Sequence, residues 1–252
     1  MKKIRLIILL TLSLTTLGQD KLSRENTKSI NQFVQFIKLN QKEQLANKVS
    51  YPIERQYPLP AIKNSEEFVK RYDELFDSNI ISKIANSVVT NDWSTVGWRG
   101  IMFMNGDIWL DYDGNLISVN YQTNFEKNKL KGLIEREKQT LNSEIQNFAK
   151  PLYLIETAKY KIRIDDLGND NLRYSAWSKN ASMKTKPNLT ITNGKVRFDG
   201  SGGNHSYFFS NNEYIYEIAI IVMGEEDSPP ASLTVTKNGQ AILYQKAKII
   251  GQ

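Results

Sequence analysis

The sequence contains no cysteine and only one histidine, His205, among its 252 residues. Without cysteine the chain has neither a disulfide nor a thiolate metal ligand. A single histidine cannot supply a histidine-rich zinc site, which takes several imidazole or thiolate ligands. The glycine-rich stretch near residue 200 also lacks the Gly-Lys-Ser/Thr ending of a phosphate-binding loop. We therefore expect neither a bound metal nor a cofactor, and we identify no catalytic residue.

An apolar stretch near the N-terminus, Leu6–Leu12, is too short to span a bilayer, which takes about 20 residues. Lys2, Lys3 and Arg5 precede it, and small and polar residues ending in Gly18 follow it. This order is typical of a cleavable secretory signal peptide, which we place at residues 1–18. No acyl-accepting cysteine follows, so we expect no lipid anchor after cleavage. The prediction is a periplasmic or secreted protein.

Charge of one sign is not in large excess. The chain has 33 basic and 27 acidic residues, and loss of the three basic residues of the predicted signal peptide leaves a net charge of +3. The densest basic stretch, residues 127–138, is interleaved with Glu126, Glu135 and Glu137, which is typical of a solvated helix surface. Because a nucleic-acid-binding protein shows a clustered basic face, we expect no nucleic-acid partner.

Helical patterns dominate the first 90 residues. A helix is predicted from Arg24 to Leu39, a short one from Asn40 to near Lys48, and a third begins after Asn64. Asn40 with Glu43, and Asn64 with Glu67, have the spacing of capping boxes at helix N-termini. Two apolar stripes have helical spacing. They consist of Ile30, Phe33, Val34 and Ile37 in the first helix and of Phe68, Tyr72, Leu75 and Phe76 in the third.

A three-stranded meander follows. Its predicted strands are Ile101–Met104, Asp107–Tyr112 and Asn115–Tyr121. They are separated by Asn105-Gly106 and by Asp113-Gly114, dipeptides that suit type I′ hairpin turns. Alternation places Asp107, Trp109 and Asp111 on one face of the middle strand.

The order helix, helix, extended segment, helix and meander over residues 24–121 resembles the cone-shaped fold of the nuclear-transport-factor-2-like and ketosteroid-isomerase-like superfamily. The stretches Tyr51-Pro52-Ile53 and Glu67–Tyr72 are similar to the N-terminal part of uncharacterised exported bacterial proteins. The resemblance implies helices packed into a curved antiparallel sheet that encloses a pocket. We name Trp109, Asp107, Asp111 and Tyr72 as candidate ligand-binding residues of that pocket.

The rest of the chain is predicted to form a connector helix followed by strands. Residues 126–150 predict an amphipathic connector helix that ends before Pro151, with Leu130, Ile134, Leu141, Ile145 and Phe148 on its apolar side. Beyond it, Asn193-Gly194 and Asn238-Gly239 indicate hairpins. Eight short strands with regular turns predict a β-sandwich or barrel; they are Tyr160–Ile164, Leu172–Trp177, Leu189–Ile191, Val196–Phe198, Tyr207–Phe209, Tyr214–Val222, Leu233–Val235 and Ala241–Tyr244.

The predicted fold is therefore α+β. A cone-like domain at 19–125 precedes the connector at 126–150 and an all-β domain at 151–252. Two acidic groups, at 111–115 and at Asp165, Asp166 and Asp170, mimic parts of calcium loops. Both lack the full ligand set, and we interpret them as turn residues.

A glycine-rich loop carries the lone histidine. Ser201-Gly202-Gly203 precedes the aromatic strand Tyr207-Phe208-Phe209, which is similar to the loop and strand of periplasmic inhibitors of c-type lysozyme, although the cysteines of that family are missing here. We name Ser201, His205 and Tyr207 as loop candidates. His205 has two interpretations, a general base or a residue of a surface loop, and we favour the surface loop.

The sequence as a whole favours an exported, non-enzymatic binding or interaction protein. Its partner is either a small ligand or a protein. If the partner is a protein, one role for the chain is inhibition of a secreted hydrolase. The alternative is a small-molecule enzyme that uses a carboxylate, Asp107 or Asp111, in the N-terminal pocket.

Overall fold

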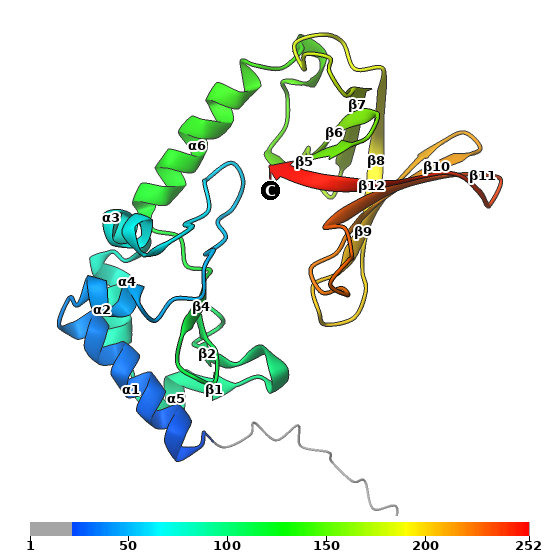
Figure 1. The fold of residues 1–252 in the computed structure, drawn as a ribbon. Helices are drawn as coiled ribbons and strands as arrows, with labels where there is room; N and C mark the ends of the chain where they lie inside the picture. The colour runs from blue at the N-terminus through cyan, green and yellow to red at the C-terminus, as the bar shows by residue number, and fades with distance from the viewer. Residues whose placement is uncertain (1–21, 252) are drawn as a thin grey trace, which may run out of the picture. The chain divides into compact units, whose positions relative to one another are not determined.

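The computed structural model of the protein describes residues 22–251, so the predicted signal peptide lies outside the described residues. The chain divides into two compact units (Figure 1). The first comprises the chain up to Ser50 together with Phe76–Tyr121, and the second comprises Tyr51–Leu75 together with the chain from Gln122 onward. The second unit is therefore built from two separate segments, and each unit is described by itself below.

The first unit combines helices with a small antiparallel sheet of strand order β1-β2-β3-β4. Its helices are α1 (Arg24–Lys38), α2 (Lys42–Ala46), α4 (Ser78–Ala85) and α5 (Val89–Asp92), and a 3-10 turn, η1, spans Gly97–Arg99. Its strands are β1 (Trp93–Thr95), β2 (Ile101–Phe103), β3 (Ile108–Leu110) and β4 (Leu116–Val119).

The apolar stripe of α1 is confirmed, because all four predicted residues are buried. The helix begins after Ser23, whose Oγ accepts a hydrogen bond from the backbone N–H of Asn26 at 3.0 Å. The predicted cap at Asn40 is wrong. Asn40 has a φ of 50°, in the left-handed conformation that often ends a helix, and it follows α1 instead of opening α2. The cap at Asn64 is confirmed by a 2.9 Å hydrogen bond from the Glu67 N–H to Asn64 Oδ1.

The three predicted strands of the meander are present, but the sequence did not reveal β1, which pairs with β2. The predicted type I′ turn at Asn105-Gly106 is wrong. Positive φ angles occur at Met104 and Gly106, and the Met104 N–H donates to the Asp92 carbonyl at 2.7 Å. The connection from Phe103 to Ile108 is therefore a four-residue loop, in which Asn105 has no need of a left-handed conformation.

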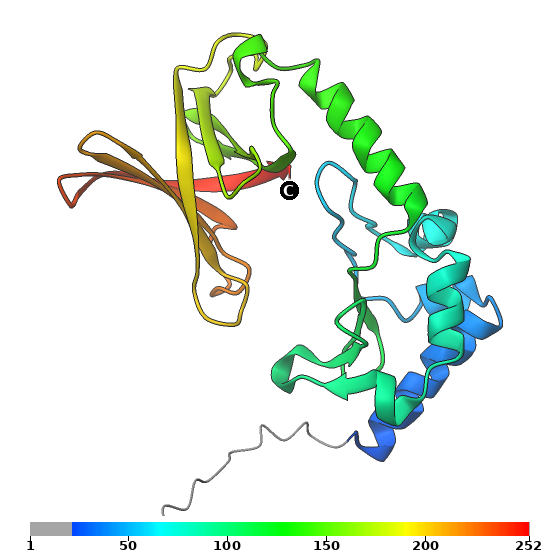
Figure 2. The same ribbon diagram turned by 180° about the vertical axis from the view of Figure 1, so that it is seen from behind.

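The second unit contains α3 (Ser65–Leu75), α6 (Asn124–Lys138), the 3-10 turn η2 (Ser143–Ile145) and a closed antiparallel barrel of eight strands. Each strand pairs with its neighbours in sequence, and β12 closes the barrel on β5, which makes an up-and-down barrel (Figure 2). The strands are β5 (Lys150–Thr157), β6 (Tyr160–Asp166), β7 (Leu172–Ser178), β8 (Leu189–Phe198), β9 (His205–Asn211), β10 (Tyr214–Ile220), β11 (Ala231–Lys237) and β12 (Gln240–Gly251). The α+β class is thus confirmed, and the all-β part is a barrel.

Two long strands, β8 and β12, each pair with one neighbour over their first part and with the other neighbour over their last part. The first part of β8 pairs with β7, and its last part pairs with β9. The sequence placed a hairpin at Asn193-Gly194, which is wrong. Asn193 has a φ of 61° inside a continuous strand, beside a register irregularity of the β7–β8 pair. A Cβ on Gly194 would lie 2.2 Å from Phe209 Cε1, so glycine is required by close packing.

The count of eight strands is right although two assignments behind it are wrong. One long strand, β8, replaces two predicted short ones, and β5 was missed because Pro151 looked like the residue that stops a helix. Pro151 instead lies in β5 beside a register irregularity, where a strand tolerates the missing N–H. The hairpin at Asn238-Gly239 is confirmed by φ angles of 48° and 80°.

Unit 2 has an apolar cluster outside the barrel as well as one inside it. The predicted connector helix ends at Lys138 instead of extending to residue 150. Its predicted apolar residues are nevertheless buried together with Leu59 and Trp177, on the outer side of β7. Asp165, interpreted from sequence as a turn residue, lies inside β6 and is fully buried between Arg163 and Arg173.

None of the helices found between residues 22 and 251 is long and apolar enough to cross a membrane.

Candidate functional site

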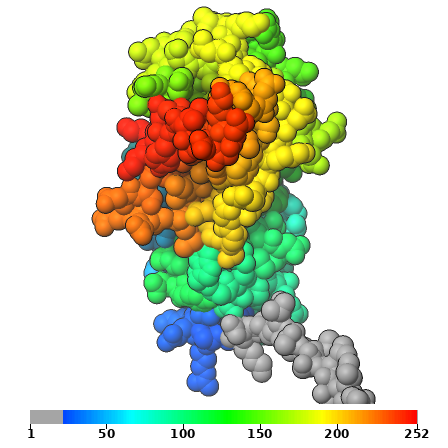
Figure 3. All heavy atoms as spheres, turned by 90° about the vertical axis from the view of Figure 1, so that its right-hand side faces the viewer, coloured from blue at the N-terminus to red at the C-terminus, as the bar shows by residue number. Residues whose placement is uncertain are grey.

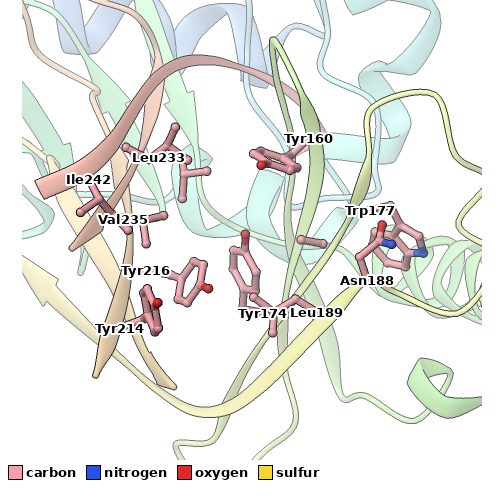
Figure 4. Close-up of a pocket in the computed structure, with 12 residues that line it drawn as sticks. Tyr160, Tyr174, Trp177, Asn188, Leu189, Tyr214, Tyr216, Leu233, Val235 and Ile242 are labelled. Atoms are coloured by element: carbon pink, nitrogen blue, oxygen red, sulfur yellow. The ribbon is translucent and has the colours of Figure 1, made fainter. Parts of the chain in front are cut away.

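A cavity of about 240 Å³ opens in the barrel of the second unit. Most of the barrel interior is filled by aliphatic and aromatic side chains, among them Ile155, Ile162, Ile164 and Ile218, each of which has no exposed surface. The cavity lies where β6, β8, β10 and β12 begin, and its wall contains four tyrosines (Figure 4). They are Tyr160, Tyr174, Tyr214 and Tyr216, and Ala176, Leu189, Leu233, Val235 and Leu243 supply much of the apolar lining.

Tyr174 is the central residue of this wall. Its side chain is 2% exposed, and its ring centroid lies 5.4 Å from that of Phe209 and 5.6 Å from that of Tyr216. Burial raises the pKa of both the Tyr174 and the Tyr216 hydroxyls above the ordinary tyrosine value. Both phenols are therefore neutral at physiological pH and are able to donate a hydrogen bond to a ligand.

The lining favours an uncharged ligand, because none of the side chains that form it carries a formal charge. Charge lies beside the wall, where Lys237 Nζ is 5.2 Å from the centroid of the Tyr214 ring and 3.1 Å from Glu213 Oε1. Desolvating a charged group inside such a cavity would cost free energy without a partner to offset it. Aromatic walls with a few hydroxyl groups are typical of sites for small, mainly apolar molecules.

His205 and Tyr207, two of the loop candidates, belong to a cluster at the other end of the barrel. His205 Nδ1 donates to the Gly203 carbonyl at 2.7 Å, so in the neutral ring Nε2 accepts from Tyr153 Oη at 3.2 Å. The Tyr207 ring packs edge-on against His205, with 5.4 Å between centroids. His205 is the first residue of β9 and not a loop residue, and both its ring nitrogens are engaged within the protein.

Ser201, the third loop candidate, is exposed in the β8–β9 loop. Asn204 ties this loop to the β10–β11 loop, because its side chain accepts from the N–H groups of Val222 and Met223 and donates to the Met223 carbonyl, each at 2.8 Å. Phe198, Val222 and Met223 are 68%, 63% and 50% exposed. The end of β8 and the β10–β11 loop thus expose three apolar side chains to solvent.

The candidates of the N-terminal half are divided between the two units. Asp107, Trp109 and Asp111 stay together in unit 1, where only Trp109 lies within β3 and the aspartates flank it. The buried face of that strand belongs to Ile108 and Leu110, whereas Trp109 is half-buried on the opposite face.

The carboxylate of Asp111 has a role in a turn. It accepts hydrogen bonds from the backbone N–H and the Nδ2 of Asn115, at 2.8 and 2.9 Å. Tyr72 lies in α3 of unit 2 and is 1% exposed, with its ring centroid 6.0 Å from that of Phe68. The structure therefore does not bring Tyr72 into one described site with Trp109.

Across residues 22–251, no three His, Cys, Asp or Glu side chains are grouped so that they could hold a metal ion.

The comparisons with known proteins give no assignment. No family model, no curated protein and no solved structure matches this chain. The candidate site therefore rests on geometry alone.

The cavity tyrosines were not predicted as site residues. Their sequence signal is weak but visible, since Tyr214, Tyr216, Ile218 and Ile220 recur with period two, as expected for the inward face of a barrel strand. What the sequence does not show is that β6, β7 and β10 meet around a space left unfilled.

Proposed function

We propose that this chain is an exported binding protein without catalytic activity, which holds a small, uncharged and mainly apolar ligand in its barrel. The observation that supports the proposal is the tyrosine-lined cavity of about 240 Å³. A dry apolar cavity of about 150 Å³ is enough to bind benzene. The volume here suits a molecule of one or two rings, and the phenols of the buried Tyr174 and the partly buried Tyr216 supply hydrogen bonds that orient it.

The test uses N-phenyl-1-naphthylamine, an uncharged two-ring dye whose fluorescence rises in apolar surroundings. We expect one dye per chain, with binding weakened at least tenfold by Leu243→Trp, which replaces a lining side chain of the cavity by a larger one. The matched control is Tyr244→Trp, at the next residue of β12, which is 59% exposed and is expected to bind like the wild type. Binding that is unchanged in Leu243→Trp, with the fold intact by circular dichroism, would contradict the proposal.

A second candidate function, inhibition of a secreted hydrolase, has its own observation. The surface of Phe198, Val222 and Met223 stands beside three exposed acids of the β10–β11 loop, Glu225, Glu226 and Asp227. Figure 3 shows the surface of β8–β12 in yellow to red. An apolar loop tip flanked by negative charge suits a basic partner with a concave site. A c-type lysozyme is the probe. Inhibition that is lost in Met223→Asp and kept in Leu243→Trp would support it, and no inhibition by the wild type would contradict it.

The finer assignment of unit 1 to the cone-shaped fold is likewise our proposal. Its support is the packing of α1 against the sheet, where the rings of Phe33 and Trp93 meet edge-on at 5.9 Å.

A further inference from the structure

Unit 1 presents an exposed tryptophan beside a half-buried one. Trp98, on the 3-10 turn η1, is 61% exposed, and Trp109 lies on the sheet face that points away from the buried strand residues. Together with Arg99, Ile117, Ser118 and Asn120 they line an open groove of about 440 Å³. Large aromatic side chains left in water lose the stabilisation that burial would bring, and they are enriched where proteins bind partners.

The turn that carries Trp98 is fixed to the sheet. Tyr112 Oη donates to the Gly97 carbonyl at 2.5 Å, and the Val96 N–H donates to the Gly100 carbonyl at 2.9 Å. Gly100 has a φ of 100°, and a Cβ there would lie 2.3 Å from the Leu110 carbonyl oxygen, so only glycine allows this approach. Because the backbone of the turn is fixed before binding, no backbone conformational entropy is lost there when a ligand arrives.

The groove also has polar groups in defined positions. The Arg99 guanidinium carbon lies 5.9 Å from the centroid of the Trp109 ring, and in the described part of the chain no carboxylate pairs with Arg99. Trp109 Nε1 and Asn120 Nδ2 both donate to the Gly106 carbonyl, at 3.1 and 2.8 Å. Ser118 Oγ donates to Asn120 Oδ1 at 2.8 Å. The lone pairs of Ser118 Oγ therefore remain available to a ligand hydroxyl.

We propose that this groove binds an oligosaccharide that carries carboxylate groups, independently of the ligand of the barrel. A pyranose ring with equatorial substituents has an apolar C–H face that stacks on an indole, while its hydroxyls remain at the edge for Ser118 and Asn120. The planar guanidinium of Arg99 pairs with a carboxylate through two parallel hydrogen bonds. The groove, with two tryptophans in its lining, is larger than the barrel cavity and suits a short sugar chain, whereas the barrel cavity suits one compact molecule.

The experiment is calorimetric titration of the full chain with two β-1,4-linked hexasaccharides that differ only at C6, oligoglucuronate, which is acidic, and cellohexaose, which is neutral. We expect the acidic chain to bind at least tenfold more tightly at low salt. Trp98→Ala is expected to weaken it by about tenfold or more, as for other central aromatic contacts. Arg99→Gln is expected to bring the two sugars to equal affinity.

The control is Tyr244→Ala, an aromatic of similar exposure in the other unit, which is expected to bind both sugars like the wild type. No binding of oligoglucuronate, or binding unaffected by Trp98→Ala, would overturn the proposal. Equal binding of the two sugars to the wild type would also overturn it, as would a dimer in sedimentation that Trp98→Ala dissociates. The dye titration of the barrel is expected to be unchanged in Trp98→Ala, so the two proposals fail separately.

Discussion

Asp165 and Arg173 face each other across the β6–β7 pair, and Arg173 Nη2 donates to Asp165 Oδ2 at 2.7 Å although both side chains are almost completely buried. Arg163 adds a second ion pair to the same carboxylate at 2.7 Å and reaches Glu137 of α6 at 2.6 Å. The Arg163 guanidinium also lies 4.7 Å from the centroid of the Phe148 ring. This ionic cluster lies on the outer side of the barrel and connects α6 to β6 and β7.

Asp165→Asn tests the cluster. We expect a loss of about 3–5 kcal/mol in the free energy of unfolding, because two buried arginines would lose the charge that offsets their desolvation. The measurement is urea unfolding. Asp199→Asn is the matched control, since the Arg197–Asp199 pair is exposed and such pairs contribute about 0–1 kcal/mol. Equal losses in the two variants would show that the cluster does not stabilise the barrel.

Gly194→Ala tests the close approach within β8. The added methyl group would collide with the Phe209 ring, and we expect destabilisation of about 1–3 kcal/mol, as in other overpacked cores. Gly132 in α6 has no atom within 4 Å of its Cβ position, so Gly132→Ala should stabilise the protein by up to about 1 kcal/mol. A thermal unfolding scan that gave the two variants shifts of the same sign would refute this interpretation.

Glu74→Gln tests a pH dependence. Burial alone would raise the pKa of Glu74, but hydrogen bonds from Lys129 and Arg71 outweigh it, and the pKa is lowered. The stabilisation is therefore fully present above the pKa of an unfolded glutamate and is lost as the pH falls through the lowered native pKa. We expect Glu74→Gln to cost about 1 kcal/mol at pH 7 and to converge with the wild type in acid. Curves that stay parallel down to pH 2 would contradict the assignment.

Fragments test how the barrel depends on its outer cluster. Residues 152–252 alone would lack α6 and Phe148 and would expose Trp177, which is 1% exposed in the protein. We expect residues 122–252, which keep α6 and Phe148 but lack Leu59 and α3 of the same unit, to unfold at a higher urea concentration than residues 152–252. If the shorter fragment were equally stable, the outer cluster would be dispensable for the barrel.

Local patterns determined many elements of this protein. The apolar stripe of α1, the cap at Asn64 and the hairpin at Asn238-Gly239 depend on neighbouring residues, so periodicity and turn chemistry were sufficient to predict them. The α+β class and the eight strands followed from the same signals, even though β5 and β8 were assigned incorrectly.

Only the tertiary structure decided what depends on partners distant in sequence. Asn193 became a bulge inside a strand because β8 pairs on both sides of it, and Asp165 became part of an ion cluster because β7 and α6 place charges beside it. The cavity lined by Tyr174 and Tyr216 arises in the same way. A cavity is space that several strands together leave unfilled, so the residues of any one strand are not sufficient to predict it.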